Sequence, residues 1–164
     1  MGHLPRHHLK TYRIFQILLR MRMQLLHKVA SFGLSREEMK NIYILFVRSI
    51  LEQSATVWHS SLTLQNKEDL ERVQKSAVRL ILGKEYTGYK KSLQILEMAN
   101  LDERRRELCL RFAKNAAKHG KMKTSICNMK TRNREKYVVP YANTQRLQKS
   151  PIIYMQNLLN MEQI

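Results

Sequence analysis

Ser35-Arg36-Glu37-Glu38 begins the stretch that decides the fold class, and it continues as Met39-Lys40-Asn41-Ile42-Tyr43-Ile44-Leu45-Phe46-Val47-Arg48-Ser49-Ile50-Leu51. The first four residues match a capping box, in which Ser35 caps a helix start and Glu38 reaches back to it. The apolar residues beyond it recur at helical spacing and form a set broad enough to be largely buried: Ile42, Tyr43, Phe46, Val47, Ile50, Leu51 and Trp58. The pattern predicts a buried helix that runs to about His59.

Signals on either side of this stretch predict further helices. Thr63 is a plausible N-cap, Asp102 can cap a later helix, and Ser150-Pro151 suits the start of a last one. The expected helices cover residues 5–30, 64–83, 89–98, 102–120 and 151–164, with stops at Gly33, Gly83 and Gly120. The fold class is therefore predicted to be all-α, a small bundle of about five or six helices. The expected segments are a basic amphipathic helix (1–34), a helical core (35–120), a basic arm (121–150) and a C-terminal helix (151–164).

The first helix is predicted to be amphipathic. Its apolar stripe, expected to pack on protein, consists of Ile14, Leu18, Met21, Leu25 and Val29. Arg13, Arg20 and His27 recur every seven residues on another face, which suits contact with phosphate. Residues 1–34 contain six Lys or Arg and no acid. A mitochondrial transit peptide has the same character, but this segment is poor in Ser and has no evident cleavage boundary.

The totals limit the class of protein. The 164 residues are 43% hydrophobic, enough for one domain with a modest core. Thirty Lys and Arg against 13 Asp and Glu leave a net charge of +17. Cys109 and Cys127 are too few for a disulfide-built secreted fold, and no 18-residue apolar span occurs. We expect an intracellular, nuclear or cytoplasmic protein without a membrane span.

A charge of this size favours an anionic partner, and polyphosphate backbones are the commonest one. The predicted partners are RNA, DNA or an RNA–DNA hybrid, without a small-molecule substrate. Backbone contacts are expected from Arg13, Arg20, Lys67, Arg72, Lys75 and Arg79 on helices. Two alternatives stay open: a basic interaction protein that binds an acidic partner or membrane surface, and a non-functional remnant.

Residues 121–150 differ in composition from the rest. They hold eight Lys or Arg and a single acid, Glu135. We interpret them as a loosely ordered arm that becomes ordered on a partner and clamps it. Its expected contact residues are Lys121, Lys123, Lys130, Arg132, Arg134 and Lys136. Tyr137 and Tyr141 add a weak signal for base stacking.

No catalytic or metal site is predicted. Polymerases need paired carboxylates to hold two metal ions, and the only aspartates here, Asp69 and Asp102, stand apart at predicted helix starts. The glycines lie at helix ends rather than in a phosphate-binding loop. We expect no cofactor and no enzymatic activity from the chain alone.

Short motifs in a consistent order resemble the region after the palm in jockey-like, LINE-type reverse transcriptases of non-LTR retrotransposons. They include Phe32-Gly33-Leu34-Ser35, Val57-Trp58-His59-Ser60, Leu70-Glu71-Arg72-Val73-Gln74-Lys75 and Arg79-Leu80-Ile81-Leu82-Gly83. Leu93-Gln94-Ile95-Leu96, Leu101-Asp102-Glu103-Arg104-Arg105 and Lys149-Ser150-Pro151-Ile152-Ile153-Tyr154 continue the resemblance, which covers the chain from about Tyr12 onward.

The resemblance implies a helical thumb and trailing segment that grip a template–primer duplex. It also implies that the catalytic aspartate pair of the RNA-directed DNA polymerase belongs to an upstream palm, which becomes a further expected partner. Under this resemblance the chain is expected to be a fragment, either a truncated copy or a host-recruited piece of a transposable element.

Overall fold

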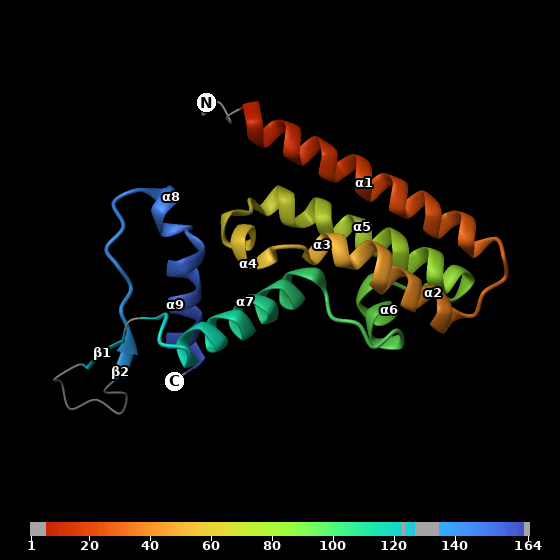
Figure 1. Cartoon of the computed structure of the whole chain (residues 1–164). Helices are drawn as coiled ribbons and strands as arrows, with labels where there is room; N and C mark the ends of the chain where they lie inside the picture. The colour runs from red at the N-terminus through yellow and green to blue at the C-terminus, as the bar shows by residue number, and fades with distance from the viewer. Residues whose placement is uncertain (1–5, 123, 127–134, 163–164) are drawn as a thin grey trace. The chain divides into compact units, whose positions relative to one another are not determined.

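The computed structural model describes residues 6–122, 124–126 and 135–162, and they are mostly helical (Figure 1). The predicted all-α class is therefore confirmed. The chain divides into two compact units: unit 1 comprises Met1–Gln53 and Leu70–Ala99, and unit 2 comprises Ser54–Asp69 and Asn100–Ile164. The units interleave along the sequence, so they do not coincide with the four consecutive segments that were expected.

Unit 1 is built from helices of very different lengths. It contains α1 (Arg6–Ala30), α2 (Arg36–Ile42), the π-helical segment η1 (Tyr43–Arg48), α3 (Ser49–Glu52), most of α5 (Leu64–Leu82), the 3₁₀ turn η3 (Gly83–Glu85) and α6 (Tyr89–Ile95). Its core includes Tyr43, Val47 and Leu51, which are fully buried and lie four residues apart. Leu26 of α1 and Ala77 and Val78 of α5 are also buried in unit 1.

The predicted helix from Ser35 to His59 is not continuous. It passes through the π turn of η1 and ends at Gln53, and Ser54 then adopts a left-handed conformation (φ 53°). Phe46, predicted to be buried, is 43% exposed. The wider π turn keeps residues four apart on the buried face, and Phe46, one residue before Val47, lies off that face.

The packing side of α1 also differs from the prediction. Leu19 and Leu26 are buried, whereas the predicted packing residues Leu18, Met21 and Leu25 are exposed. A helix turns about 100° per residue, so α1 carries two apolar stripes displaced by one residue. Leu19 and Leu26 belong to the stripe that faces the rest of unit 1.

Both features of the capping box are present at the start of α2. The Ser35 backbone N–H donates to Glu38 Oε2 (2.8 Å), and the Glu38 N–H donates to Ser35 Oγ (3.3 Å). The hydrogen bonds from Ser35 hold the pKa of Glu38 below its usual value. This predicted helix start is confirmed.

Replacing Ser35 by alanine is expected to lower the free energy of unfolding of the chain by about 1 kcal/mol, because the first turn of α2 loses its cap. The measurement is urea denaturation followed by circular dichroism. Ser49→Ala is the matched control, because Ser49 lies inside the helical run and its hydroxyl only donates back to the Leu45 carbonyl (2.6 Å). Equal losses in the two variants would contradict a capping role.

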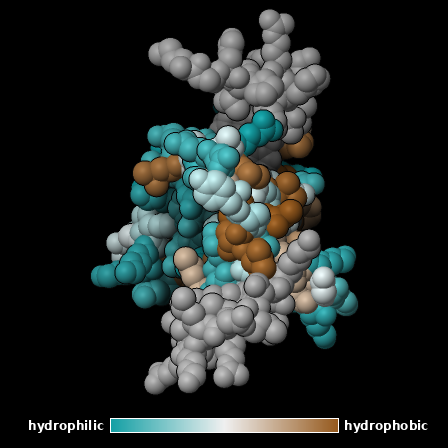
Figure 2. Space-filling view, turned by 90° about the vertical axis from the view of Figure 1, so that its left-hand side faces the viewer, coloured by the Kyte–Doolittle hydropathy of each residue, from teal (hydrophilic) through white to brown (hydrophobic). Residues whose placement is uncertain are grey.

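Unit 2 is built around α7 and α9. It contains α4 (Ala55–Trp58), the 3₁₀ turn η2 (His59–Ser61), the start of α5, α7 (Leu101–Lys118), β1 (Thr124–Ile126), β2 (Glu135–Tyr137), α8 (Gln145–Gln148) and α9 (Pro151–Glu162). Ala113 of α7 packs against Met155 and Leu159 of α9. On the face drawn in Figure 2, hydrophobic residues gather in one area of a largely hydrophilic surface.

The helix boundaries in unit 2 follow local signals with one exception. The Asn66 N–H donates to Thr63 Oγ1 (3.2 Å), as predicted, and α9 begins at Pro151. The N-cap of α7 is Asn100, whose side chain accepts from the Glu103 N–H (2.8 Å), and not Asp102. Asp102 lies two residues further on, in the first turn, where its charge still suits the helix dipole.

The predicted arm carries ordered structure at its described ends. β1 pairs with β2 in an antiparallel register that places Ser125 opposite Lys136. The Asn160 side chain of α9 accepts from the Tyr137 N–H (2.9 Å) and donates to the Tyr137 carbonyl (3.1 Å). Further along, Ser60 Oγ donates to the Lys149 carbonyl (2.7 Å).

Candidate nucleic-acid interface

Three of the predicted contact residues form a cationic stripe along α5 in unit 1. Arg72, Lys75 and Arg79 are spaced by three and four residues, so they share one side of the helix. Arg72 and Arg79 are exposed and Lys75 is half-buried. The guanidinium of Arg79 lies over the Tyr86 ring, 5.2 Å from its centroid. We call these three residues the α5 stripe.

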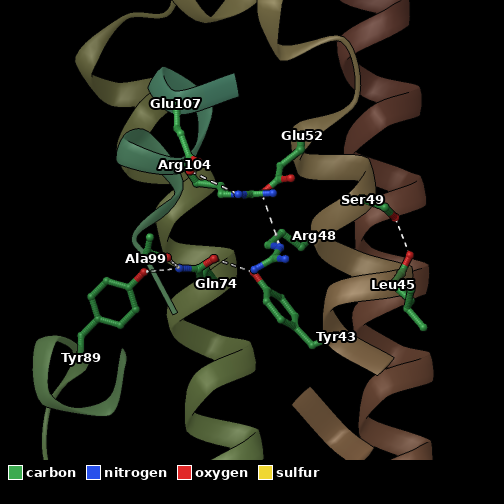
Figure 3. Close-up of polar contacts among 10 residues, drawn as sticks. All are labelled: Tyr43, Leu45, Arg48, Ser49, Glu52, Gln74, Tyr89, Ala99, Arg104 and Glu107. Carbon is green, nitrogen blue, oxygen red and sulfur yellow. Dashed lines mark hydrogen bonds and ion pairs between the residues drawn. The ribbon is translucent and has the colours of Figure 1, made fainter. Parts of the chain in front are cut away.

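A buried polar network fixes α5 within unit 1 (Figure 3). The Tyr43 hydroxyl donates to Gln74 Oε1 (2.8 Å), and Gln74 Nε2 donates to the Ala99 carbonyl (3.0 Å) and to the Tyr89 oxygen (3.1 Å). The Tyr89 hydroxyl donates in turn to the carboxylate of Glu71. Gln74 is fully buried, and its hydrogen bond with Tyr43 is shielded from water.

The two tyrosines of this network remain neutral donors. Burial raises the pKa of Tyr43 well above its usual value, and it raises that of Tyr89 together with the bond to Glu71. Gln74 joins η1, α6 and the segment that ends at Ala99 to one turn of α5. The rotation of α5 about its own axis is thereby fixed, and so is the direction of the α5 stripe.

Lys67, another of the predicted contact residues, pairs with a carboxylate in the structure. Lys67 belongs to unit 2, and its Nζ lies 2.9 Å from Asp102 Oδ1. Burial raises the pKa of Asp102, but the hydrogen bond from Lys67 and the nearby positive charges together outweigh it, and the pKa is lowered overall. Lys67 is therefore engaged with a carboxylate and is not part of the α5 stripe.

The first helix contributes exposed cations. Arg20, His27 and Lys28 are exposed on α1 of unit 1. Arg13 is also in α1, but its side chain lies outside the described residues. Arg20 therefore has the solvent exposure that a phosphate contact requires.

Unit 2 carries a second basic surface that sequence reasoning found only in part. Arg111, Lys114 and Lys118 are exposed and share one side of α7, and Lys121 follows the helix end. Arg111 forms an ion pair with Glu107 (3.0 Å), and Lys114 pairs with Glu162. The spacing of three and four residues is the signal in the sequence that indicates this surface.

Earlier in α7, the run Arg104-Arg105-Arg106 divides between surface and core, as helix geometry requires. Arg106 is exposed and Arg105 is fully buried. Among the arm residues, Lys121 is exposed, and Lys136 lies in β2 opposite Ser125. Lys123, Lys130, Arg132 and Arg134, and the side chain of Lys136, lie outside the described residues.

Within the described ranges, no group of three or more His, Cys, Asp or Glu residues is arranged to hold a metal ion. The two aspartates are engaged locally: Asp69 accepts from Gln65 Nε2 (3.0 Å), and Asp102 pairs with Lys67. Burial raises the pKa of the Cys109 thiol to about 11, so this cysteine is protonated at neutral pH.

No protein-family model, no curated protein and no solved structure matches this chain.

Proposed function

We propose that the chain is a non-enzymatic nucleic-acid-binding module that grips phosphate backbones without regard to sequence. The observation that carries this proposal is the α5 stripe on a helix whose rotation is fixed by the Gln74 network. Seven residues of helix span about 10 Å along the axis. That length is roughly the rise of three nucleotides of duplex at about 3.4 Å each.

The chemistry of the stripe suits phosphate rather than bases. Guanidinium groups bind phosphate in bidentate geometry, and an ammonium group such as that of Lys75 adds a point charge. Contacts of this kind position a protein on a nucleic acid and carry no base information. The net charge of +17 adds a long-range attraction that speeds encounter.

We further propose that the module derives from the thumb of a LINE-type reverse transcriptase, on the strength of the sequence motifs described above. A thumb grips a template–primer duplex, so the partner expected on this basis is an RNA–DNA hybrid. Catalysis would then belong to a palm that supplies the paired aspartates. A preference for the hybrid over duplex DNA of equal length supports this origin, and equal affinity for the two removes that support.

The variant Arg72→Glu/Lys75→Glu/Arg79→Glu is expected to bind an RNA–DNA hybrid about a hundredfold more weakly at about 0.1 M salt. Each lost phosphate contact removes about 0.9 from the slope of log K against log salt, so the slope falls by about 2 to 3. The measurement is fluorescence anisotropy of a labelled hybrid at several salt concentrations. Circular dichroism verifies that the variant is folded.

The matched control is Lys84→Glu/Lys90→Glu/Lys91→Glu. These lysines are exposed in unit 1 and lie outside the α5 stripe, and the variant has the same net charge. It is expected to keep most of the salt slope. If both variants lose affinity and slope equally, binding depends on total charge, and the α5 stripe is not the interface.

A further inference from the structure

The outer side of α1 bears an apolar surface that nothing in unit 1 covers. Ile17, Met21 and Leu25 recur every four residues and are 52%, 59% and 41% exposed. Leu18 lies next to this row and is 44% exposed. The other apolar stripe of the helix, displaced by one residue at Leu19 and Leu26, is buried. We call these four exposed residues the α1 stripe.

The apolar surface continues onto the neighbouring segment η1. The guanidinium of Arg22 lies over the Phe46 ring, 5.6 Å from its centroid, and joins α1 to η1 within unit 1. Phe46 is 43% exposed and Leu45 is 67% exposed. Phe32, which follows the end of α1, is 78% exposed. Large apolar side chains are therefore exposed on η1 and after the end of α1 as well as in the α1 stripe.

Cations border the α1 stripe on both sides. Successive helical residues are about 100° apart, which puts Arg20 beside Ile17 on one edge and Arg22 beside Leu18 on the other. Lys28 is exposed near the end of the helix. Residues 1–34 contain no acidic residue at all. An apolar row between two cationic edges is the arrangement of a helix that lies in a membrane interface.

The charge of α1 favours an anionic lipid surface over two other partners, a second copy of α1 and a nucleic acid. A second copy of α1 would set two acid-free, cationic helices side by side, which like-charge repulsion opposes. A nucleic-acid backbone would satisfy the cations but leave the apolar row in water. A bilayer that contains anionic lipid satisfies both, because acyl chains accept the apolar residues and headgroups pair with the cations.

We propose that the α1 stripe docks on an anionic lipid surface, with α1 lying in the plane of the interface. No helix in the described part of the chain is long and apolar enough to cross a bilayer, so the contact we infer is one-sided. Met21 and Leu25 enter the acyl boundary, and Arg20 and Arg22 reach the headgroups. The surface is separate from the α5 stripe and its role does not depend on nucleic-acid binding.

The test is flotation of the full chain with vesicles of phosphatidylserine and phosphatidylcholine, compared with vesicles of phosphatidylcholine alone. We expect binding to the anionic vesicles, and binding about tenfold or more weaker for Met21→Gln/Leu25→Gln. This variant changes no charge and alters only exposed side chains, so folding and hybrid binding are expected to persist. The matched control is Val57→Gln/Leu64→Gln, at residues that are 64% and 74% exposed in unit 2, and it should bind like the natural sequence.

Three results would overturn the proposal. The first is no binding to anionic vesicles at low salt. The second is equal binding by the natural chain and the Met21→Gln/Leu25→Gln variant, which would show attraction by charge alone. The third is binding of an acidic amphipathic helical peptide that depends on Met21 and Leu25 while vesicles do not bind, which would assign the α1 stripe to an acidic protein partner.

Discussion

Replacing Arg105 by alanine is expected to lower the free energy of unfolding of unit 2 by about 2 to 5 kcal/mol, the range for large-to-small substitutions in a core. The Arg105 side chain is fully buried in unit 2. Its guanidinium lies 5.8 Å from the centroid of the Trp58 ring, and its Nη2 is 3.8 Å from Asp102 Oδ1. Alanine removes both contacts and leaves a cavity between α4 and α7.

Arg105→Met separates the contribution of volume from that of charge. Methionine keeps a long unbranched stem and a sulfur that packs well on an aromatic ring. Asp102 keeps its ion pair with Lys67, so no unpaired carboxylate is created. We therefore expect Arg105→Met to cost less than about 1.5 kcal/mol, as for volume-conserving changes. A loss as large as that of Arg105→Ala would show that the charge, rather than the packing of the stem, stabilises this site.

Trp58 is a natural fluorescent probe for measuring the unfolding of unit 2. Trp58 is the only tryptophan of the chain, and it belongs to unit 2 beside Arg105. Its fluorescence during urea denaturation therefore reports the unfolding of this unit. Circular dichroism follows both units, and a difference between the two transitions would show that they unfold separately.

Unit 2 is expected to lose about 3 kcal/mol of stability between pH 7 and pH 4 through His59 alone. The His59 side chain is 3% exposed, and its ring meets the Tyr154 ring edge-on at 5.5 Å. Burial lowers its pKa to about 4 from an ordinary value of 6.5. That net value includes the Asp102 carboxylate, which raises the pKa, and the charges of Arg105 and Lys67, which lower it.

The sign follows from the order of the two pKa values. Between pH 6.5 and about pH 4 the unfolded chain binds a proton at His59 and the folded chain does not. Protons therefore favour the unfolded state, and the stability present above pH 6.5 is lost as the pH falls through this window. The lowered pKa of Asp102 acts in the same direction at lower pH, because protonation weakens its ion pair with Lys67.

His59→Phe tests this assignment. Phenylalanine keeps an aromatic ring against Tyr154 and cannot take up a proton. Urea denaturation followed by Trp58 fluorescence at several pH values between 4 and 7 should show a much flatter dependence in the variant. An unchanged slope would mean that other groups carry the acid sensitivity of unit 2.

The features that the sequence predicted well are those encoded within a few residues. The capping box depends only on the spacing of Ser35 and Glu38. The chain turns at Gly120 after α7, and the Lys121 N–H then donates to the Ala116 carbonyl (2.9 Å). Arg72, Lys75 and Arg79 share one side of α5 because of their spacing of three and four residues alone. Local chemistry suffices in each of these cases.

Features that depend on tertiary contacts were missed. The break at Ser54 has no glycine or proline to announce it, although the residue is left-handed. Arg105 is the middle residue of a run of three arginines, and only the packing of α4 on α7 distinguishes the buried one. The apolar residues of α1 form two stripes of similar strength, and the sequence does not say which one meets unit 1.

The interleaving of the two units has a consequence for any attempt to dissect the protein. The backbone passes between the units after Gln53, after Asp69 and after Ala99, so no single cut releases either unit whole. A shortened version of unit 1 must join Gln53 directly to Leu70, which removes the first turns of α5 and its Thr63 cap. The two units therefore cannot be altered independently along the sequence. An insertion, a deletion or a proteolytic nick in residues 54–99 affects both.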